Sequence, residues 1–581
     1  MSNKNKMYCN PINLPYKFQK YKNRKTMHRE AADPSIVLYK DKYWLFASMS
    51  AGFWVSQDLQ SWEYHSSPEL PATDYAPEIR VVDNAMYFCA SRRIKNCPIY
   101  RSEDPIEGKW EKISEPFAFW DPNLFQDDDG RVYLYWGCSN ATPINGTEMN
   151  KKTMRPIGEK VPLINSDTEC RGWEINGENN VIRKRKSLLE VLLGNDPFIE
   201  GAWMTKHKRK YYLQYSAPGT QHNVYGDGVF VGESPLGPYE YAKHNPFSYK
   251  PGGFIQGAGH GSTFEDKYGN LWHASTMRIS INHMFERRIG LFPAGFDEDG
   301  ILFCNTNFAD YPTNIPDYNW NPWKDALRGW MLLSFRKDVK VSSELDNYKK
   351  ENAVDESIRT FWSAKDNDIN PWIEIDLGTE STVNALQINF TEINCYPDEN
   401  KNFVYGGNLL ISKRAIDDKA VNHKYIIEGS LDGHHWKTLI DKTTNESDVP
   451  HDFIILDNPA CIRYVRLTSY LMPYGGNAAL SGLRVFGRGN GKKPNITKGI
   501  QAVMTSKTSA KLSWEKVDNA AGYNVKWGIS KNKLYSSWLL YEQTELDLNC
   551  LNSGVEYYIA IESFNENGIT KGEVMKIEGV S

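Results

Sequence analysis

A fivefold repeat in the first half of the 581-residue chain limits what this sequence can fold into. Each unit has a polar head, a short apolar run, a turn of Asp, Asn, Gly or Lys, and a strand rich in Tyr and Trp. This pattern predicts a strand, a hairpin turn and a second strand. A radial repeat of such units brings all five heads to one central axis. The units read ADPSIVLYKDKYWLFAS from Ala32, APEIRVVDNAMYFCAS from Ala76, DPNLFQDDDGRVYLYWG from Asp121, EGAWMTKHKRKYYLQYS from Glu200 and GHGSTFEDKYGNLWHAS from Gly259.

The spacing of the heads predicts the fold class. The first two steps, of about 45 residues, suit one four-stranded blade each, and the longer third step predicts an insertion over 145–195. No long amphipathic helix is evident, so we expect an all-β chain: a five-bladed β-propeller followed by two β-sandwiches. The expected limits are a lead-in over 1–28, the propeller over 29–318, a linker over 319–329, a second β-rich unit over 330–489 and a small sandwich over 494–581.

Composition excludes several classes of protein. The net charge of -4 gives no electrostatic reason to bind nucleic acid or an anionic membrane. No apolar run reaches the roughly 18 residues of a membrane span, and the first ten residues lack a signal core. We therefore expect a periplasmic or secreted protein if a signal peptide has been removed, and a cytoplasmic one otherwise. The nine scattered cysteines indicate neither a metal motif nor a disulfide scaffold, and no obligate protein partner is evident.

Three of the heads carry carboxylates: Asp33, Asp121 and Glu200. Hydrolysis of a glycosidic bond with inversion needs one carboxylate to activate water and one carboxylic acid to protonate the leaving group. A third carboxylate nearby helps to keep the acid protonated near neutral pH. A single Asp-Pro before a strand is usually only a turn. The same position in three repeats predicts a shared site.

The other candidates have structural alternatives of comparable weight. Glu78, taken as the head of the second unit, is expected either to touch substrate or simply to end a strand. His260 is expected either to sit in the core or to position water, a metal or the site. One of Arg287 and Arg288 would bind sugar hydroxyls or a carboxylate, or both lie on the surface. Four aromatic side chains would stack on sugar rings if they are not core residues: Phe53, Trp54, Trp120 and Trp203.

The ordered set of heads resembles glycoside hydrolase family 43, the five-bladed β-propeller glycosidases. The resemblance implies that Asp33, in Asp33-Pro34-Ser35, is the general base. It implies that Asp121, in Asp121-Pro122-Asn123, tunes and orients the acid, and that Glu200, in Glu200-Gly201-Ala202, is that acid. It places His260 beside a central calcium or its water, and makes Arg287 the substrate arginine, with Arg288 as the one-residue alternative. The long insertion and Phe292-Pro293, where the family often has Asp-Pro, depart from the pattern.

Two further resemblances concern the rest of the chain. The stretches AVDESIRTFWSA from Ala353, PWIEIDLG from Pro371 and EGSLDGHHW from Glu428 resemble a discoidin, or coagulation-factor type C, jelly roll. That unit would be a carbohydrate-binding module or a brace for the propeller. The tail resembles a fibronectin type III domain, with Trp514, Tyr523 and Tyr557 as core residues, and we expect it to be a spacer.

Together these resemblances imply an inverting, exo-acting α-L-arabinofuranosidase or β-xylosidase for plant-type polysaccharides or oligosaccharides. No cofactor is required, although a structural calcium is implied at the propeller centre. The alternatives are a galactan-directed exo-glycosidase of the same family, a non-catalytic carbohydrate-binding protein, and a glycoside phosphorylase. The phosphorylase would need a cationic phosphate pocket, for which only Arg287 and Arg288 are available near the heads.

Overall fold

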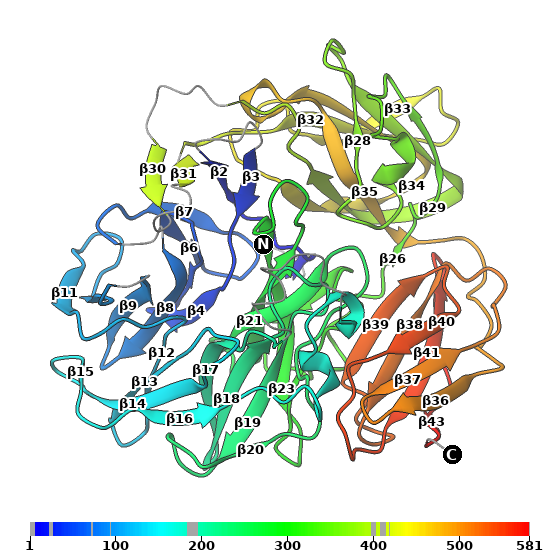
Figure 1. Cartoon of the computed structure of the whole chain (residues 1–581). Helices are drawn as coiled ribbons and strands as arrows, with labels where there is room; N and C mark the ends of the chain where they lie inside the picture. Colours follow the sequence, from blue (N-terminus) through cyan, green and yellow to red (C-terminus); the bar gives the residue numbers. More distant parts are fainter. Residues whose placement is uncertain are drawn as a thin grey trace, which may run out of the picture.

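The computed structural model describes residues 6–21, 27–70, 74–92, 95–182, 196–396, 403–406, 414–417 and 419–579. In these residues the regular structure is β-strand, apart from four short 3-10 helices: η1 (Gly172–Glu174), η2 (Glu178–Asn180), η3 (Lys350–Ala353) and η4 (Pro473–Gly475). Figure 1 shows the blades below and to the left, a second β unit above them and a third at the lower right. The predicted all-β class, a propeller followed by β-sandwich structure, is confirmed. In the described part of the chain, no helix is long and apolar enough to cross a membrane.

Five antiparallel sheets, each contiguous in sequence, form the blades. The five strand sets are β4 (Ser35–Tyr39), β5 (Lys42–Phe46), β6 (Gly52–Ser56) and β7 (Glu63–Ser66); β8 (Tyr75–Val82), β9 (Ala85–Ser91), β10 (Ile99–Ser102) and β11 (Glu111–Ser114); β12 (Asn123–Gln126), β13 (Val132–Trp136), β14 (Ile144–Asn150), β15 (Arg155–Pro156) and β16 (Val161–Ile164); β17 (Glu200–His207), β18 (Lys210–Ala217), β19 (Gly226–Gly232) and β20 (Tyr239–Tyr241); β21 (Gln256–Glu265), β22 (Leu271–Arg278), β23 (Arg287–Phe296) and β24 (Leu302–Cys304).

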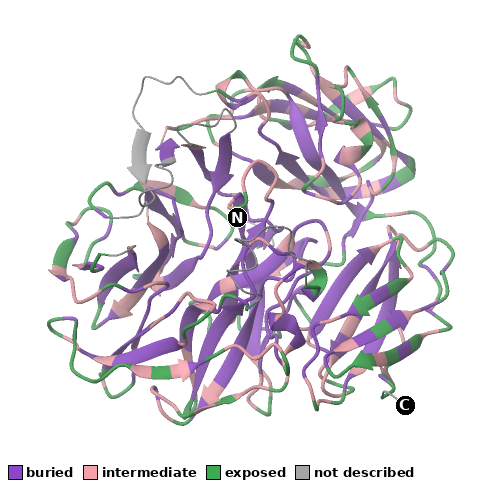
Figure 2. Cartoon of the chain, viewed as in Figure 1, coloured by how far each residue is buried: buried purple, intermediate pink, exposed green. Residues whose placement is uncertain are grey.

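Blade strands are apolar on both faces because each blade is covered by its neighbours. In blade one, Val37 and Phe46 pack with Ile79 and Phe88 of blade two, while Leu45 packs with Ile289 of blade five. The inner strands are therefore mostly buried, and most of their length is purple in Figure 2. The Lys40-Asp41 and Asp83-Asn84 turns have positive φ at both residues, which matches the twist of tight hairpins.

A ring of hydrogen bonds between blades corrects the alignment of the second repeat. The left-handed head residue of blade two is Ala76, so Glu78 is equivalent to Ser35 and Asn123, two residues after their heads. From this position a side chain accepts a backbone N–H of the next blade. The acceptors are Ser262 Oγ for Ile36 (3.2 Å), Ser35 Oγ for Ile79 (3.1 Å), Glu78 Oε1 for Leu124 (2.9 Å) and Asn123 Oδ1 for Met204 (2.8 Å). Between blades four and five, Trp203 Nε1 instead donates to Thr263 O (3.0 Å).

The second unit is an eight-stranded sheet folded around its own aliphatic core. Its strands are β26 (Met331–Leu332), β27 (Asp338–Val341), β28 (Trp362–Ser363), β29 (Trp372–Phe390), β32 (Lys424–Ser430), β33 (Trp436–Asp441), β34 (His451–Leu471) and β35 (Ala479–Arg488). Two strands from the same stretch, β30 (Phe403–Gly406) and β31 (Arg414–Asp417), leave this sheet. They pair instead with β2 (Lys17–Tyr21) and β3 (Met27–Glu30) in the order β3-β2-β31-β30. The described residues before the propeller are thus part of the folded body, and β1 (Lys6–Tyr8) pairs with β25 (Thr313–Ile315).

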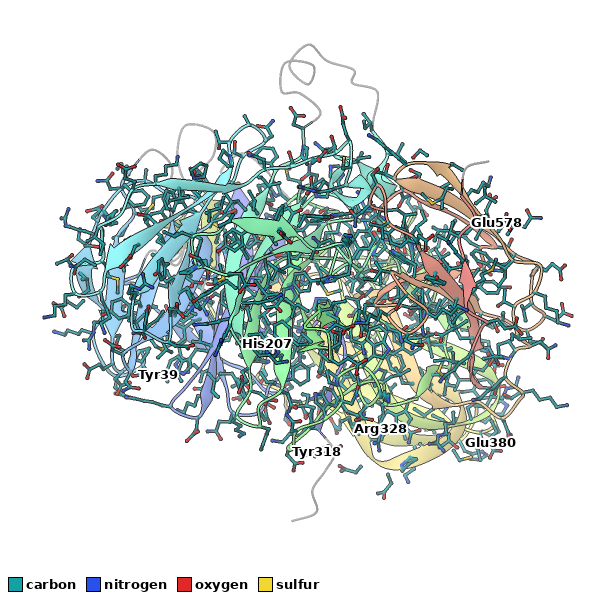
Figure 3. The ribbon with its side chains drawn as sticks, turned by 90° about the horizontal axis from the view of Figure 1, so that it is seen from below. Tyr39, His207, Tyr318, Arg328, Glu380 and Glu578 are labelled. Atoms are coloured by element: carbon teal, nitrogen blue, oxygen red, sulfur yellow. The ribbon has the colours of Figure 1, made fainter. Side chains whose placement is uncertain are left out.

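The third unit is a two-sheet sandwich. One sheet has the order β36 (Gln501–Ser506), β37 (Ser509–Ser513), β40 (Glu545–Leu548). The other has the order β39 (Ser536–Tyr541), β38 (Gly522–Gly528), β41 (Tyr558–Asn565), β42 (Gly568–Thr570), with β43 (Met575–Lys576) paired to β41. Figure 3 shows Glu578 of this unit at the opposite end of the molecule from Tyr39 of blade one.

The insertion predicted over 145–195 divides into two parts. Its first residues belong to β14, β15 and β16 and complete blade three. The following segment carries Trp173, which shares one core with blade four and the third unit. Asn552 of the third unit also donates to Asn245 O at 2.7 Å, so this unit is fixed to the propeller and is not a free spacer. The basic run Arg183–Lys186 lies outside the described residues.

Candidate active site

The heads of the repeat share an unusual backbone conformation. Asp33, Asp121 and His260 have φ values of 52°, 49° and 48°, and the blade-two head Ala76 has 46°. Non-glycine residues rarely occupy this left-handed region, and such strain persists where the surrounding structure enforces it. In blade four the equivalent position is Gly201, with φ 62°, so Glu200 reaches the axis from one residue earlier. The repeated conformation aims these side chains into one central pocket.

The three predicted carboxylates line this single cavity of about 510 Å³. Its lining includes Asp33, Asp121, Glu200, His260 and Arg287. It also includes the predicted Trp120 and residues that the sequence analysis did not single out: Asp74, Tyr75, Ser91, Cys138, Phe198, Thr220 and Phe285. A cavity lined by both charged groups and aromatic rings is suited to hold and cleave a small polar ring.

Glu200 is held by two hydrogen-bond donors that sequence reasoning missed. The Tyr225 hydroxyl donates to Oε1 at 2.6 Å, and the Cys138 thiol donates to Oε2 at 3.1 Å. Ser48 and Ser91, at the ends of the second strands of blades one and two, accept the backbone N–H of the next blade's head. In blade three the residue at the same register is Gly137, because Asn123 pairs with Tyr135 as Ser35 pairs with Phe46, so an alignment of the repeat does not identify Cys138. Tyr225 gave no signal either.

Asp33 lies among donors from three elements. Ser48 Oγ donates to Oδ2 at 2.5 Å, and Arg287 Nη1 and Nη2 lie 3.1 and 3.3 Å from Oδ1 and Oδ2. Its own backbone N–H donates to Thr276 Oγ1 at 2.7 Å. These contacts fix the orientation of the carboxylate, which lines the pocket.

Asp121 is the carboxylate most perturbed by its surroundings. Burial raises its pKa to about 7, with the nearby carboxylates of Glu200 and Asp33 adding to the rise and His260 opposing it. One oxygen of Asp121 and one of Glu200 lie within 4.8 Å of each other. Asp121 therefore exchanges its proton in the same pH range in which the site would work, while remaining in electrostatic contact with Glu200.

His260 connects two of the carboxylates. Its Nδ1 lies 3.4 Å from Asp33 Oδ1 and 3.8 Å from Asp121 Oδ2. Burial alone would lower the pKa of the imidazole, but Asp33, Asp121 and Glu200 together raise it above its ordinary value. A protonated ring would neutralise part of the negative charge in the pocket.

A calcium ion takes about six to eight oxygen ligands, water molecules included, so an ion beside His260 would have to be held largely through water. The carboxylate beneath the ring, Asp227, already accepts from Ser216 Oγ, the His260 and Gly261 N–H groups and His273 Nε2. The metal-compatible group within the described chain is Asp121, Cys138 and Glu200. Its thiol suits softer metals than calcium. We therefore assign no step to a metal.

The two neighbouring arginines face opposite ways. Arg287 lines the pocket and pairs with Glu30 (2.7 Å) and Asp33. Arg288 is 1% exposed and donates to Arg29 O (2.9 Å) and His451 Nε2 (2.8 Å), away from the cavity. The geometry thus selects Arg287 over the one-residue alternative.

Four residues expected to touch substrate lie elsewhere, which corrects their placement. Phe53 is stacked on Phe46 in the core between blades one and two, and Trp54 is fully buried between blades one and five. Trp203 is buried in the ring between blades, under Arg80, and Glu78 is buried in the same ring. An aromatic repeat cannot show which rings face a neighbouring blade and which face the axis. Trp120 alone of the predicted aromatic residues lines the pocket.

Comparison with known families agrees with this geometry. Residues 26–302 match the family described as glycosyl hydrolases family 43, and residues 338–404 match the F5/8 type C domain. A beta-xylosidase of Xylanibacter ruminicola is 30% identical over 152 residues, which are 25% of this chain and 44% of that protein. A beta-D-galactofuranosidase of Aspergillus niger is 24% identical over 40% of this chain and 69% of its own length. A xylosidase/arabinosidase of Humicola insolens is 28% identical over 29% of this chain and 56% of its own length.

The matched regions span about half the length of most of these relatives. Among solved structures, a family 43 protein of Bacillus licheniformis aligns over 82% of this chain and 100% of its own, with 14% identity and a TM-score of 0.41. A family-43 glycoside hydrolase described as thermostable aligns over 54% of this chain and 99% of its own, with 21% identity and a TM-score of 0.41.

Proposed function

We propose that this protein is an inverting, exo-acting glycoside hydrolase, because its residues 26–302 match the glycosyl hydrolases family 43. The observation that carries the proposal is the meeting of Asp33, Asp121 and Glu200, which are far apart in sequence, in one cavity beside Arg287. Inversion requires two carboxyl groups with different roles and a space between them for water.

In this proposal Glu200 is the general acid. Its Oε1 and Oε2 are held by the Tyr225 hydroxyl and the Cys138 thiol, so the carboxyl has a fixed orientation towards the glycosidic oxygen. Glu200 protonates that oxygen as the bond breaks. Asp121, whose pKa burial raises to about 7, lies close by and is proposed to tune and orient this acid.

Asp33 is the general base. Ser48 and Arg287 hold its two oxygens, and it takes a proton from a water that attacks the anomeric carbon from the opposite face of the ring. Arg287 also projects into the cavity and can donate to a sugar hydroxyl.

An exo-acting enzyme suits the shape of the site. The carboxylates line an axial cavity of about 510 Å³ whose wall carries Tyr75, Trp120, Phe198 and Phe285. A cavity that encloses one end of a chain favours release of terminal residues, and its rings provide flat apolar surfaces for a sugar. We propose α-L-arabinofuranosides or β-xylosides as substrates, in agreement with the names of the xylosidase and xylosidase/arabinosidase relatives. The relative named as a galactofuranosidase makes β-D-galactofuranosides the second candidate.

The remaining units are proposed to support this domain. The second unit corresponds to the predicted discoidin-like module. The third unit, with β36-β37-β40 facing β39-β38-β41-β42, has the strand order expected of a fibronectin type III-like sandwich. Both pack against the propeller through buried contacts, which favours bracing over free tethering.

The proposal is tested with p-nitrophenyl α-L-arabinofuranoside, β-xyloside, β-galactoside and β-D-galactofuranoside, with and without phosphate. We expect hydrolysis of one of the first two, independent of phosphate, and loss of that activity in Glu200→Ala but not in the exposed-residue control Glu69→Ala. Proton NMR of the first-formed sugar should show the inverted anomer. Activity of Glu200→Ala equal to that of the parent would remove the acid assignment, and a retained anomer would remove the role of Asp33.

A further inference from the structure

Two adjacent strands connect the candidate pocket with the second unit. β3 runs from Met27 to Glu30 and leads directly to Asp33, and β23 begins at Arg287. The two strands meet where Ala31 N lies 3.5 Å from Arg287 O. Figure 1 shows β2 and β3, in dark blue, between the blades below and the second unit above. Because side chains alternate along a strand, consecutive residues here face different parts of the molecule.

On the pocket side, Glu30 and Arg287 form a buried ion pair. Arg287 Nη2 lies 2.7 Å from Glu30 Oε1, and Arg287 Nη1 lies 3.1 Å from Asp33 Oδ1. Glu30 is 0% exposed and Arg287 is 3% exposed. The position of the proposed base and of the sugar-binding arginine therefore depends on where β3 places Glu30.

On the opposite side, Arg29 is locked into the second unit. Its Nε lies 2.5 Å from Glu392 Oε1, which follows β29, and its Nη1 and Nη2 lie 2.6 and 3.0 Å from the two oxygens of Asp448, which precedes β34. Arg29 Nη1 also donates to Tyr16 O at 2.9 Å. The guanidinium is fully buried.

A second arginine strengthens the same connection. Arg288 Nη1 donates to Arg29 O at 2.9 Å, so it holds the β3 backbone itself, and its Nε lies 2.8 Å from His451 Nε2 of β34. His451 Nδ1 is in turn paired with Asn389 Oδ1 of β29 at 2.9 Å. Thus Arg29 and Arg288 face the second unit, while Glu30 and Arg287, one residue away on each strand, face the pocket.

We infer that Arg29 is a positioning residue through which the second unit holds the active-site strand, so that the F5/8 type C region is part of the catalytic architecture and not an independently tethered module. A bidentate guanidinium–carboxylate pair fixes direction as well as distance. Removing one partner of a buried pair leaves an unpaired charge that the structure relieves by moving. Here the element affected is β3, which carries Glu30 and leads to Asp33, and Arg287 is affected through its pair with Glu30.

A matched control exists at the same interface. Arg484 of the second unit is also 1% exposed and pairs with Glu356 through Nε and Nη2, both at 2.9 Å, and with Asp310 O at 2.6 Å. It has no contact with β3 or β23 among these bonds. Arg29→Met and Arg484→Met therefore both break a buried arginine–carboxylate pair, but only the first breaks the path to Asp33.

The first experiment is hydrogen exchange of the full chain, which does not depend on any glycoside. We expect the amides of residues 31–36 to exchange at least about tenfold faster in Arg29→Met than in the parent, because each tenfold corresponds to about 1.4 kcal/mol of local opening. Arg484→Met should leave this segment unchanged. Equal protection of residues 31–36 in both variants would overturn the inference.

The second experiment rests on the proposed function and uses the best substrate of the panel above. Arg29→Met should lower kcat at least about tenfold, with a smaller change in KM. Arg484→Met should keep kcat within about twofold of the parent, even if its thermal midpoint falls as far as that of Arg29→Met. Asp448→Asn keeps the side-chain volume and one acceptor oxygen, so its kcat should lie between those of the parent and Arg29→Met. This variant replaces Arg29→Met in the test if Arg29→Met does not fold. A parent without glycosidase activity contradicts the proposed function, while an active parent with equal kcat in the two arginine variants contradicts the positioning role.

Discussion

Replacing Asp121 by Asn should stabilise the protein at neutral and alkaline pH while impairing it as an enzyme. In the folded protein burial raises the pKa of this carboxyl from 3.8 to about 7. The side chain is 5% exposed, so solvent screens the effect little. Between these two pH values the folded state retains a proton that the unfolded chain has released.

The sign of the effect follows from this proton balance. Where the folded state binds more protons than the unfolded state, the free energy of unfolding falls as the pH rises. The stability is fully present below about pH 4 and is lost as the pH rises through about 7. From pH 5 to pH 7, at about 1.4 kcal/mol per pH unit, this single group lowers the free energy of unfolding by about 3 kcal/mol. The side-chain amide of the Asp121→Asn variant cannot ionise, so that loss should disappear.

The assay is urea unfolding of the parent and of Asp121→Asn at pH 5 and pH 8. Between the two pH values the free energy of unfolding of the parent should fall by about 3 kcal/mol more than that of the variant. The exposed-residue control Asp518→Asn should behave as the parent. At the same time kcat of Asp121→Asn should fall at least about tenfold. If parent and variant show the same change in unfolding free energy with pH, burial does not raise the pKa of Asp121 in the folded protein.

Three further substitutions separate the parts of the site. Tyr225→Phe removes one hydrogen bond to Glu200 and should lower kcat about tenfold with little change in the thermal midpoint; an unchanged kcat would deny the tyrosine a positioning role. Glu78→Ala leaves a backbone N–H of blade three unpaired and should cost about 2 kcal/mol in urea unfolding, with KM unaltered. Trp120→Ala should raise KM about tenfold, whereas the buried Trp54→Phe should not, and the opposite ranking would relocate the sugar-binding wall.

The sequence by itself determined the blades and the identity of the acidic groups. Period-two strands joined by tight turns of Asp, Asn and Gly predict antiparallel hairpins, and five such units with matching heads predict a radial arrangement. Asp33, Asp121 and Glu200 stand next to their strands at nearly the same place in the repeat, so their convergence could be predicted from register alone. The same register predicted His260 as a site residue and limited the candidate substrate-binding arginine to Arg287 or Arg288.

Only the tertiary structure decided which side each remaining residue faces. Ala76, not Glu78, is the head of blade two, because a shift of two residues preserves the alternation of the strand and leaves no trace in its pattern. Phe53, Trp54, Trp203 and Trp120 look alike in sequence, but only Trp120 faces the axis, since the others fill the spaces between blades. Tyr225, Cys138 and the Arg29 connection join residues from separate blades or units, and such long-range contacts arise only when the chain closes upon itself.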